Sequence, residues 1–358
     1  MRSSQTTSMA RRSPSPQRRL RPQRRLRPRR RLPAWAALLL CALLVAAACA
    51  LSLLLGASTL SPGEILSSLL DPASTGARIL LHVRLPRLCG TLLAGAALAA
   101  AGAILQSVLG NPIASPNVIG VNAGAGFAVA LCTALAPTGA ALLPAAAFLG
   151  ALAAVLLVFF LARATGASRT TLILSGVALN SLLNAGTDTV TTLFPDVLVG
   201  SLSFRVGGVA GLTLERLAFP AVYIGVGLLA ALLLSHDMDV LSLGDETARS
   251  LGLRVQATRF LLLGTAAALA GAAVSFAGLL GFVGLIVPHA ARFLVGGEAR
   301  RLLPTSILLG AAFLTLCDVA ARLLFAPYEL PVGIVMSFLG CPFFLYLLIR
   351  RKGGRVHA

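Results

Sequence analysis

Side chains that could do chemistry are sparse in this chain, and phosphate chemistry is the first class to consider. A nucleotide-binding P-loop needs a lysine followed by Ser or Thr at the end of a glycine-rich turn. The only lysine is Lys352, near the C-terminus, so any ATP-driven work is expected to need another subunit. We also find no Ser–His–Asp grouping, no paired carboxylates and no cysteines or histidines at metal-ligand spacing. The sequence therefore predicts a protein without a catalytic site, a metal site or a cofactor.

A polar island interrupts the apolar sequence at residues 241–253. Ser242 precedes Asp245 at capping-box spacing, and Asp245 stands one helical turn before Arg249. Gly252 is a typical C-terminal stop. The pattern predicts a helix of about two turns, which is too short to be stable alone in water. It must therefore be held by the flanking segments or by a partner.

A second polar pattern runs along the apolar segment at 171–194. Its members recur at helical spacing and form one stripe: Gly176, Asn180, Asn184, Thr187 and Thr191. Such groups can hydrogen-bond a neighbouring helix or line a pathway through a helix bundle. The length of the stripe favours the pathway.

The third candidate is a polar turn from Asn111 to Pro116, which two prolines interrupt. Proline removes a backbone donor and restricts the residue before it, so the turn marks at least a helix boundary. Gln106 lies shortly before it, in a segment otherwise rich in apolar and small residues. A turn of this kind can also narrow a pathway, and the residues alone leave both interpretations open.

The elements that position these groups are membrane spans. Apolar residues make up 57% of the chain, and the mean hydropathy is +0.88, which excludes an ordinary soluble domain. We predict an all-α polytopic membrane protein with about ten spans. The apolar runs lie at 33–55, 89–109, 117–137, 141–162, 171–194, 213–235, 258–278, 281–296, 303–325 and 331–349.

The net charge of +18 is concentrated at the ends of the chain and in a few loops. Residues 1–32 are rich in Arg, Pro, Ser and Gln, which predicts a disordered basic tail. Beside a span, such a tail favours the cytoplasmic side and anionic lipid over nucleic acid. The basic end at 350–355 should lie on the same side, which requires an even number of spans. The island at 241–253 then faces the cytoplasm as well.

Longer motifs in the second half carry a family resemblance. Residues 279–292 read LLGFVGLIVPHAAR, and they are followed by RRLLP at 300–304, DVAAR at 318–322 and GCPFFLY at 340–346. In the first half, the run from Arg84 to Gly126 fits the same pattern. The chain resembles the iron-siderophore, haem and vitamin B12 permease family of ABC importers, often called the FecCD family.

The resemblance implies a type II ABC importer permease in the cytoplasmic membrane of a prokaryote. It implies two ATPase subunits, an extracytoplasmic binding protein and a second permease subunit in a homodimer or a heterodimer. Residues 33–350 would form the transmembrane domain, between the tail at 1–32 and a cytoplasmic tail at 351–358. Both termini would be cytoplasmic.

The resemblance also assigns roles to residues. The coupling helix, at about 242–252, would meet the ATPase through Asp245, Glu246, Ala248, Arg249 and Gly252. The cytoplasmic gate would consist of Asn111, Pro112, Ile113 and Ala114. The stripe from Gly176 to Thr191 would line the pathway, and Arg84, Arg87, Arg322 and Arg205 would dock the binding protein.

Several alternatives stay open. Arg84 and Arg87 could anchor lipid phosphate, and Arg322 could neutralise Asp318 one turn before it. Residues 204–211 depart from the family pattern, so that loop does not indicate the cargo. Siderophore is the expected cargo because it is the broadest class in the family, with haem and corrinoid as alternatives. An ion-coupled carrier or a membrane-embedded enzyme is the rival class, but it should place acids or a polar cluster near the bilayer midplane.

Overall fold

The computed structural model of the chain describes residues 32–56, 63, 74–164 and 169–353. Within these residues the chain forms helices joined by turns, without a β-strand. This confirms the predicted all-α class. The basic tail predicted at 1–32 and most of the tail predicted at 351–358 lie outside the described residues.

The helices follow the predicted apolar runs. Those that correspond to the runs are α1 (Ala34–Leu54), α4 (Leu85–Val108), α5 (Val121–Leu135), α6 (Leu143–Ala164), α7 (Arg169–Leu193), α9 (Leu214–Leu233), α12 (Val255–Ala277), α13 (Val283–Val295), α14 (Ala299–Leu323) and α15 (Val332–Gly353). Shorter helices connect them: α3 (Thr75–Ile79), α8 (Asp196–Val206), α10 (Ser235–Ser242) and α11 (Asp245–Ser250). Six helices of the described chain are long and apolar enough to cross a membrane, and shorter apolar helices accompany them.

The second predicted span begins earlier than its hydropathy suggested. Thr75 to Val108 form one continuous helical rod of 34 residues, with a π-helical turn at Leu80–Arg84 directly before Pro86. Proline has no N–H to donate and crowds the preceding turn. The wider π-helical turn accommodates it, so the rod continues where the sequence indicated a start.

The bundle is built around α4. Of its most apolar window, 83% is buried, compared with 22% for α1, so α4 is central and α1 peripheral. A Cβ at Gly95 would overlap the carbonyl of Gly310 on α14, and one at Gly102 would overlap the carbonyl of Gly284 on α13. These glycines let the helix backbones touch, which suits a membrane where lipid offers helices no hydrophobic drive to associate.

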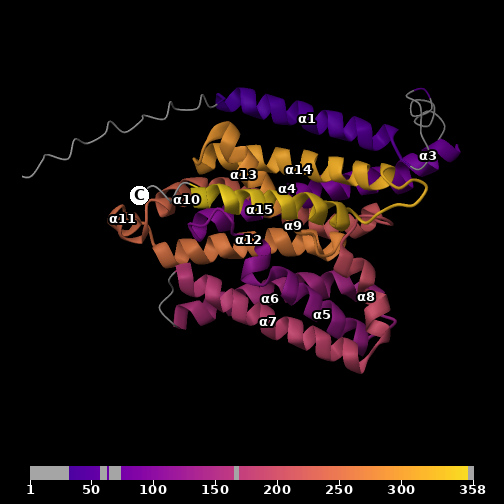
Figure 1. Cartoon of the computed structure of the whole chain (residues 1–358), viewed down its shortest axis with the longest axis horizontal. Helices are drawn as coiled ribbons and strands as arrows, with labels where there is room; N and C mark the ends of the chain where they lie inside the picture. Colours follow the sequence, from indigo (N-terminus) through magenta and orange to yellow (C-terminus); the bar gives the residue numbers. More distant parts are fainter. Residues whose placement is uncertain (1–31, 57–62, 64–73, 165–168, 354–358) are drawn as a thin grey trace, which may run out of the picture. The chain divides into compact units, whose positions relative to one another are not determined.

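The two ends of the bundle differ. In Figure 1, α10 and α11 lie at one end, where α1 begins and the described chain finishes. The helices α3 and α8 lie at the opposite end. A break between the predicted runs 258–278 and 281–296 is present at 278–282, between α12 and α13. Gly278 and Phe282 there have φ values of +70° and +64°.

We predict that Gly95→Leu lowers the thermal unfolding midpoint of the detergent-purified protein. The added side chain must push α14 away, and overpacking of this kind costs about 1–3 kcal/mol. The matched control is Gly264→Leu on α12, because no atom lies within 4 Å of a Cβ built there. Equal midpoints for the two variants would contradict the proposed backbone contact.

Candidate transport pathway and coupling surface

The short helix predicted at about 242–252 is present as α11, but it starts differently. Ser242 does not cap it: Ser242 ends α10 and donates to the Asp239 carbonyl at 2.6 Å. Gly244, at φ +105°, reverses the chain before α11 instead. The predicted stop at Gly252 is observed, since its N–H donates to the Arg249 carbonyl at 2.9 Å and that of Leu253 to the Ala248 carbonyl at 3.0 Å. This pattern is a Schellman C-cap.

Asp245 also has other partners than expected. It accepts two hydrogen bonds from Arg259 of α12, at 2.9 and 3.0 Å, and lies 3.7 Å from Arg169 of α7. No hydrogen bond or ion pair with Arg249 is found among the described residues. The i,i+4 pair is replaced because the Arg259 side chain, only 1% exposed, has this carboxylate within reach. Asp245 therefore joins α11 to the bundle.

The rest of α11 presents two faces. Ala248 is fully buried, whereas Glu246, Arg249 and Gly252 are exposed. Apolar Leu243 and Leu251 flank the exposed polar residues, at 61% and 63% exposure. The exposed side of α11 therefore combines charged and apolar side chains.

Arg169 connects this region to the predicted gate. Its guanidinium donates to the Leu241 carbonyl at 3.1 Å and also lies where a Cβ at Gly110 would stand. Gly110 directly precedes the turn at Asn111. One side chain at the start of α7 thus lies beside Asp245, the end of α10 and the residue that precedes the predicted gate.

The gate turn is internally bonded. The Asn111 side chain accepts from the Ile113 N–H at 3.2 Å, and its carbonyl accepts from the Ala114 N–H at 3.0 Å. Ala114 is buried, whereas Asn111, Pro112 and Ile113 are half-buried. The turn is therefore a preformed element, and Arg169 lies beside Gly110, the residue before it.

Gln106 links the rod before the turn to α13. Its amide nitrogen donates to the Gly284 carbonyl at 3.0 Å, and its oxygen accepts from Arg292. Both hydrogen-bonding groups of the amide are thus used inside the protein.

Some residues of the polar stripe line a cavity, and others pack against a neighbouring segment. Asn180, Asn184 and Thr187 line a cavity of about 470 Å³ between α5, α7 and α8. Asn180 also donates to the Asn117 carbonyl at 2.8 Å. Gly176 is buried against the backbone of Val118, so it serves helix contact. Thr191 is not part of this lining.

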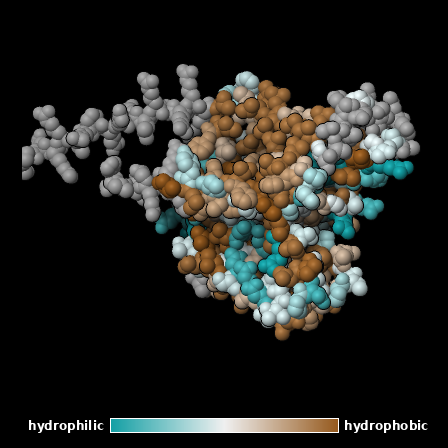
Figure 2. Space-filling view, turned by 45° about the vertical axis from the view of Figure 1, so that its right-hand side comes forward, coloured by the Kyte–Doolittle hydropathy of each residue, from teal (hydrophilic) through white to brown (hydrophobic). Residues whose placement is uncertain are grey.

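A second cavity of about 690 Å³ lies beside the first. Arg205, Leu279 and Phe338 are among its lining residues, and Arg205 and Leu279 line the first cavity too. Figure 2 shows a face on which hydrophilic residues gather in a hollow between hydrophobic surfaces. The described residues hold no cluster of His, Cys, Asp or Glu that could bind a metal ion.

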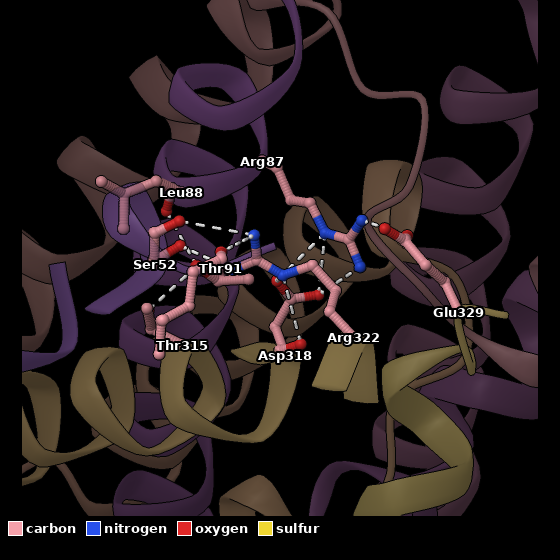
Figure 3. Close-up of polar contacts among 9 residues, drawn as sticks. Ser52, Arg87, Leu88, Thr91, Thr315, Asp318, Arg322 and Glu329 are labelled. Atoms are coloured by element: carbon pink, nitrogen blue, oxygen red, sulfur yellow. Dashed lines mark hydrogen bonds and ion pairs between the residues drawn. The ribbon is translucent and has the colours of Figure 1, made fainter. Parts of the chain in front are cut away.

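Three of the arginines expected to dock a binding protein lie inside the molecule. Arg84, Arg87 and Arg322 are only 3%, 7% and 3% exposed. Arg87 and Arg322 flank Asp318, with N–O distances of 3.0 and 3.2 Å (Figure 3). Asp318 is itself 1% exposed, so the cluster is a buried ion pair shared by α4 and α14.

The same arginines hold the end of α1. Arg322 donates to the Ser52 hydroxyl at 2.9 Å and to the Leu55 carbonyl at 3.1 Å, and Arg84 donates to the Leu53 carbonyl. Cationic donors at a helix C-terminus satisfy its last carbonyls and complement its dipole. These contacts account for Arg84 and Arg322 without a docking partner or lipid phosphate.

Glu329 completes the cluster, at 2.6 Å from Arg87. Neither Glu329 nor Ser52 was assigned to this cluster from the sequence, because each lies far from its partner along the chain. The sequence does show more arginines than acids at these span ends, and this excess could have indicated that the arginines need partners from elsewhere in the chain. A buried arginine needs a carboxylate or carbonyl partner.

A model of the FecCD transport family matches residues 43–350. The chain belongs to this family. It is 38% identical over 313 residues to the Fe(3+)-citrate import system permease protein YfmE of Bacillus subtilis, covering 87% of this chain and 94% of that protein. It is 39% identical over 316 residues to the ferric enterobactin transport system permease protein FepD of Escherichia coli, covering 87% and 94%.

A solved structure agrees with the FecCD assignment. It shows a metal-chelate type ABC transporter in an inward-facing conformation, with a TM-score of 0.78 and 29% identity. The alignment covers 88% of this chain and 99% of that chain. The resemblance seen in the sequence motifs is thereby confirmed, and so is the permease fold.

We predict that Asp318→Asn strongly destabilises this FecCD permease. Removing the carboxylate leaves two buried arginines without their shared charge, and breaking a buried pair costs about 3–5 kcal/mol. The measurement is thermal unfolding in detergent. Glu298→Gln is the matched control, because its pair with Arg301 is about half exposed, and such pairs contribute about 0–1 kcal/mol. A midpoint equal to that of the control would contradict the role of Asp318.

We predict that a cysteine at Asn184 reacts with a membrane-impermeant thiol reagent, since this side chain is exposed and lines the first cavity. The exposed Cys341 is first changed to Ser, because it lines the second cavity. Ala151→Cys, at a fully buried position, should stay unlabelled. Equal labelling at the two positions in every nucleotide state would remove Asn184 from the pathway.

Proposed function

We propose that this chain is the permease subunit of an ABC importer that moves a ferric siderophore or a related ferric chelate across the cytoplasmic membrane. Ferric chelates are the cargo named for the Bacillus subtilis and Escherichia coli relatives. Haem and corrinoid remain the alternatives within the family. The energy would come from ATPase subunits, because the chain itself provides no P-loop lysine.

One observation carries the proposal: the contacts of Asp245 link an exposed docking helix to the elements beside the pathway. The exposed face of α11, with Glu246 and Arg249, would sit in an ATPase groove. Asp245 binds Arg259 of α12 and Arg169 of α7. A displacement of α11 on ATP binding would therefore pull on α7, which carries the polar stripe.

The same displacement would reach the gate. Arg169 lies against Gly110, directly before the turn that contains Asn111, Pro112, Ile113 and Ala114. Moving Arg169 would release or compress this turn while the buried bundle moves as a unit. Such rigid-body switching between two arrangements is the general means by which packed helices transmit a change.

We place the α11 end of the bundle on the cytoplasmic side. Arg163, Arg169, Arg300 and Arg301 lie at helix ends or loops expected on this side, in accord with the positive-inside rule. Both termini would then be cytoplasmic. The binding protein would approach the opposite end, beside α8.

A second permease subunit would cover the face that carries the two cavities. Large apolar side chains are exposed there: Phe338 and Leu345 of α15, at 76% and 52%, line the second cavity. A second subunit on this face would close the two cavities laterally and so enclose a pathway between the two chains. The second subunit can be a copy of this chain or a related one.

The test is uptake of radiolabelled ferric chelate into proteoliposomes that contain the permease, its ATPase subunits and the binding protein. We expect ATP-dependent uptake, and Glu246→Arg should reduce it at least about tenfold, since a misplaced charge at an interface costs more than 1.4 kcal/mol. The variant should remain folded. Glu215→Arg is the matched control, because this exposed acid lies in the first turn of α9, away from α11.

Two results would contradict the proposal. Unchanged uptake and ATP hydrolysis in Glu246→Arg would remove α11 as the coupling element. Uptake that persists without ATP and follows an ion gradient would instead show an ion-coupled carrier.

A further inference from the structure

Arg205 occupies the junction of the two cavities. It lies in the last turn of α8, is exposed, and lines both the cavity of about 470 Å³ and the cavity of about 690 Å³. Leu279, from the break between α12 and α13, is the other residue common to both linings. A molecule that passes from one cavity to the other therefore meets this guanidinium.

The surroundings of Arg205 are mostly neutral. It is the one basic residue among the described residues that line either cavity, and Asp188 is the one acid. The remaining polar lining of the first cavity consists of amides and a few hydroxyls. Asp188 offsets this charge in the first cavity, whereas Arg205 is the one charged residue among the described residues that line the second, so the charge preference is expected to be set on that side.

The Arg205 guanidinium also differs in its contacts from four other arginines of the bundle. Arg87, Arg322, Arg169 and Arg259 each bind a carboxylate. Arg205 makes no hydrogen bond or ion pair with any described residue. Its donors are therefore available to the cavities. A guanidinium presents a planar fork that suits carboxylate and other oxygen anions in a bidentate arrangement.

We propose that Arg205 is a specificity residue that favours ferric chelates with net negative charge and exposed oxygen anions over neutral chelates. This inference rests on the proposed function and names the cargo class for the same pathway. It replaces the docking role expected for Arg205, because the side chain lines cavities that a cargo can enter.

The test measures chelate binding directly, so that selection by the binding protein does not enter. The permease with its ATPase subunits is placed in nanodiscs, and equilibrium dialysis gives the Kd for two radiolabelled probes. Ferric citrate is the anionic probe. A ferric trihydroxamate, in which the hydroxamate charges balance the metal, is the neutral probe.

We expect Arg205→Gln to weaken ferric citrate binding about tenfold, or about 1.4 kcal/mol, without changing the Kd of the neutral chelate. Arg205→Lys should retain most of the preference because it keeps the charge. Arg216→Gln is the matched control, since this exposed arginine of α9 lines a separate cavity beside Phe219. It should bind both probes like the wild type.

Three results would overturn the inference. The first is an equal loss for both probes in Arg205→Gln. The second is an intact chelate preference together with weaker association of the binding protein, measured by interferometry, which would restore the docking role. The third is a wild type that binds neither probe: if ATP-driven uptake persists, only the role of Arg205 fails, whereas loss of uptake also removes the proposed function.

Discussion

A charge buried among membrane helices must find its partner within the protein, because hydrocarbon offers no water to replace it. At each end of this bundle, one aspartate binds two arginines from different parts of the chain. Asp318 is shared by Arg87 and Arg322, and Asp245 by Arg259 and Arg169. The Asp318 cluster joins α4 and α14 and holds the end of α1, and the Asp245 cluster joins α11 to α7 and α12.

The two clusters differ in their exposure to water. This difference decides how much free energy is needed to break each contact. The Asp318 side chain is 1% exposed, so breaking its pairs would strand charges in a low-dielectric interior. The Asp245 side chain is 32% exposed and that of Arg169 is 30% exposed, so water can replace their contact at small cost. The contacts of Asp318 are therefore costlier to break than the contact between Asp245 and Arg169.

Close backbone contacts make such a division possible. The glycine pairs between α4 and its neighbours, such as Gly95 with Gly310, keep the central helices in register. The polar side chains that face the cavities lie outside this packed centre, on α5, α7 and α8. The closely packed centre and the polar cavity side are therefore separate parts of the bundle.

The sequence by itself determined the fold class, most of the helix positions and a short helix near 242–252, because these follow from local hydropathy and turn chemistry. It also indicated the family, because the family motifs are contiguous runs of sequence. Only the tertiary structure decided the partners of the charged groups. Asp245 accepts hydrogen bonds from Arg259, 14 residues away, rather than from Arg249, one helical turn away. Arg322 donates to the hydroxyl of Ser52, 270 residues away. Spacing along one helix cannot predict such pairs, since the position of the opposite helix sets which carboxylate or carbonyl a buried guanidinium meets.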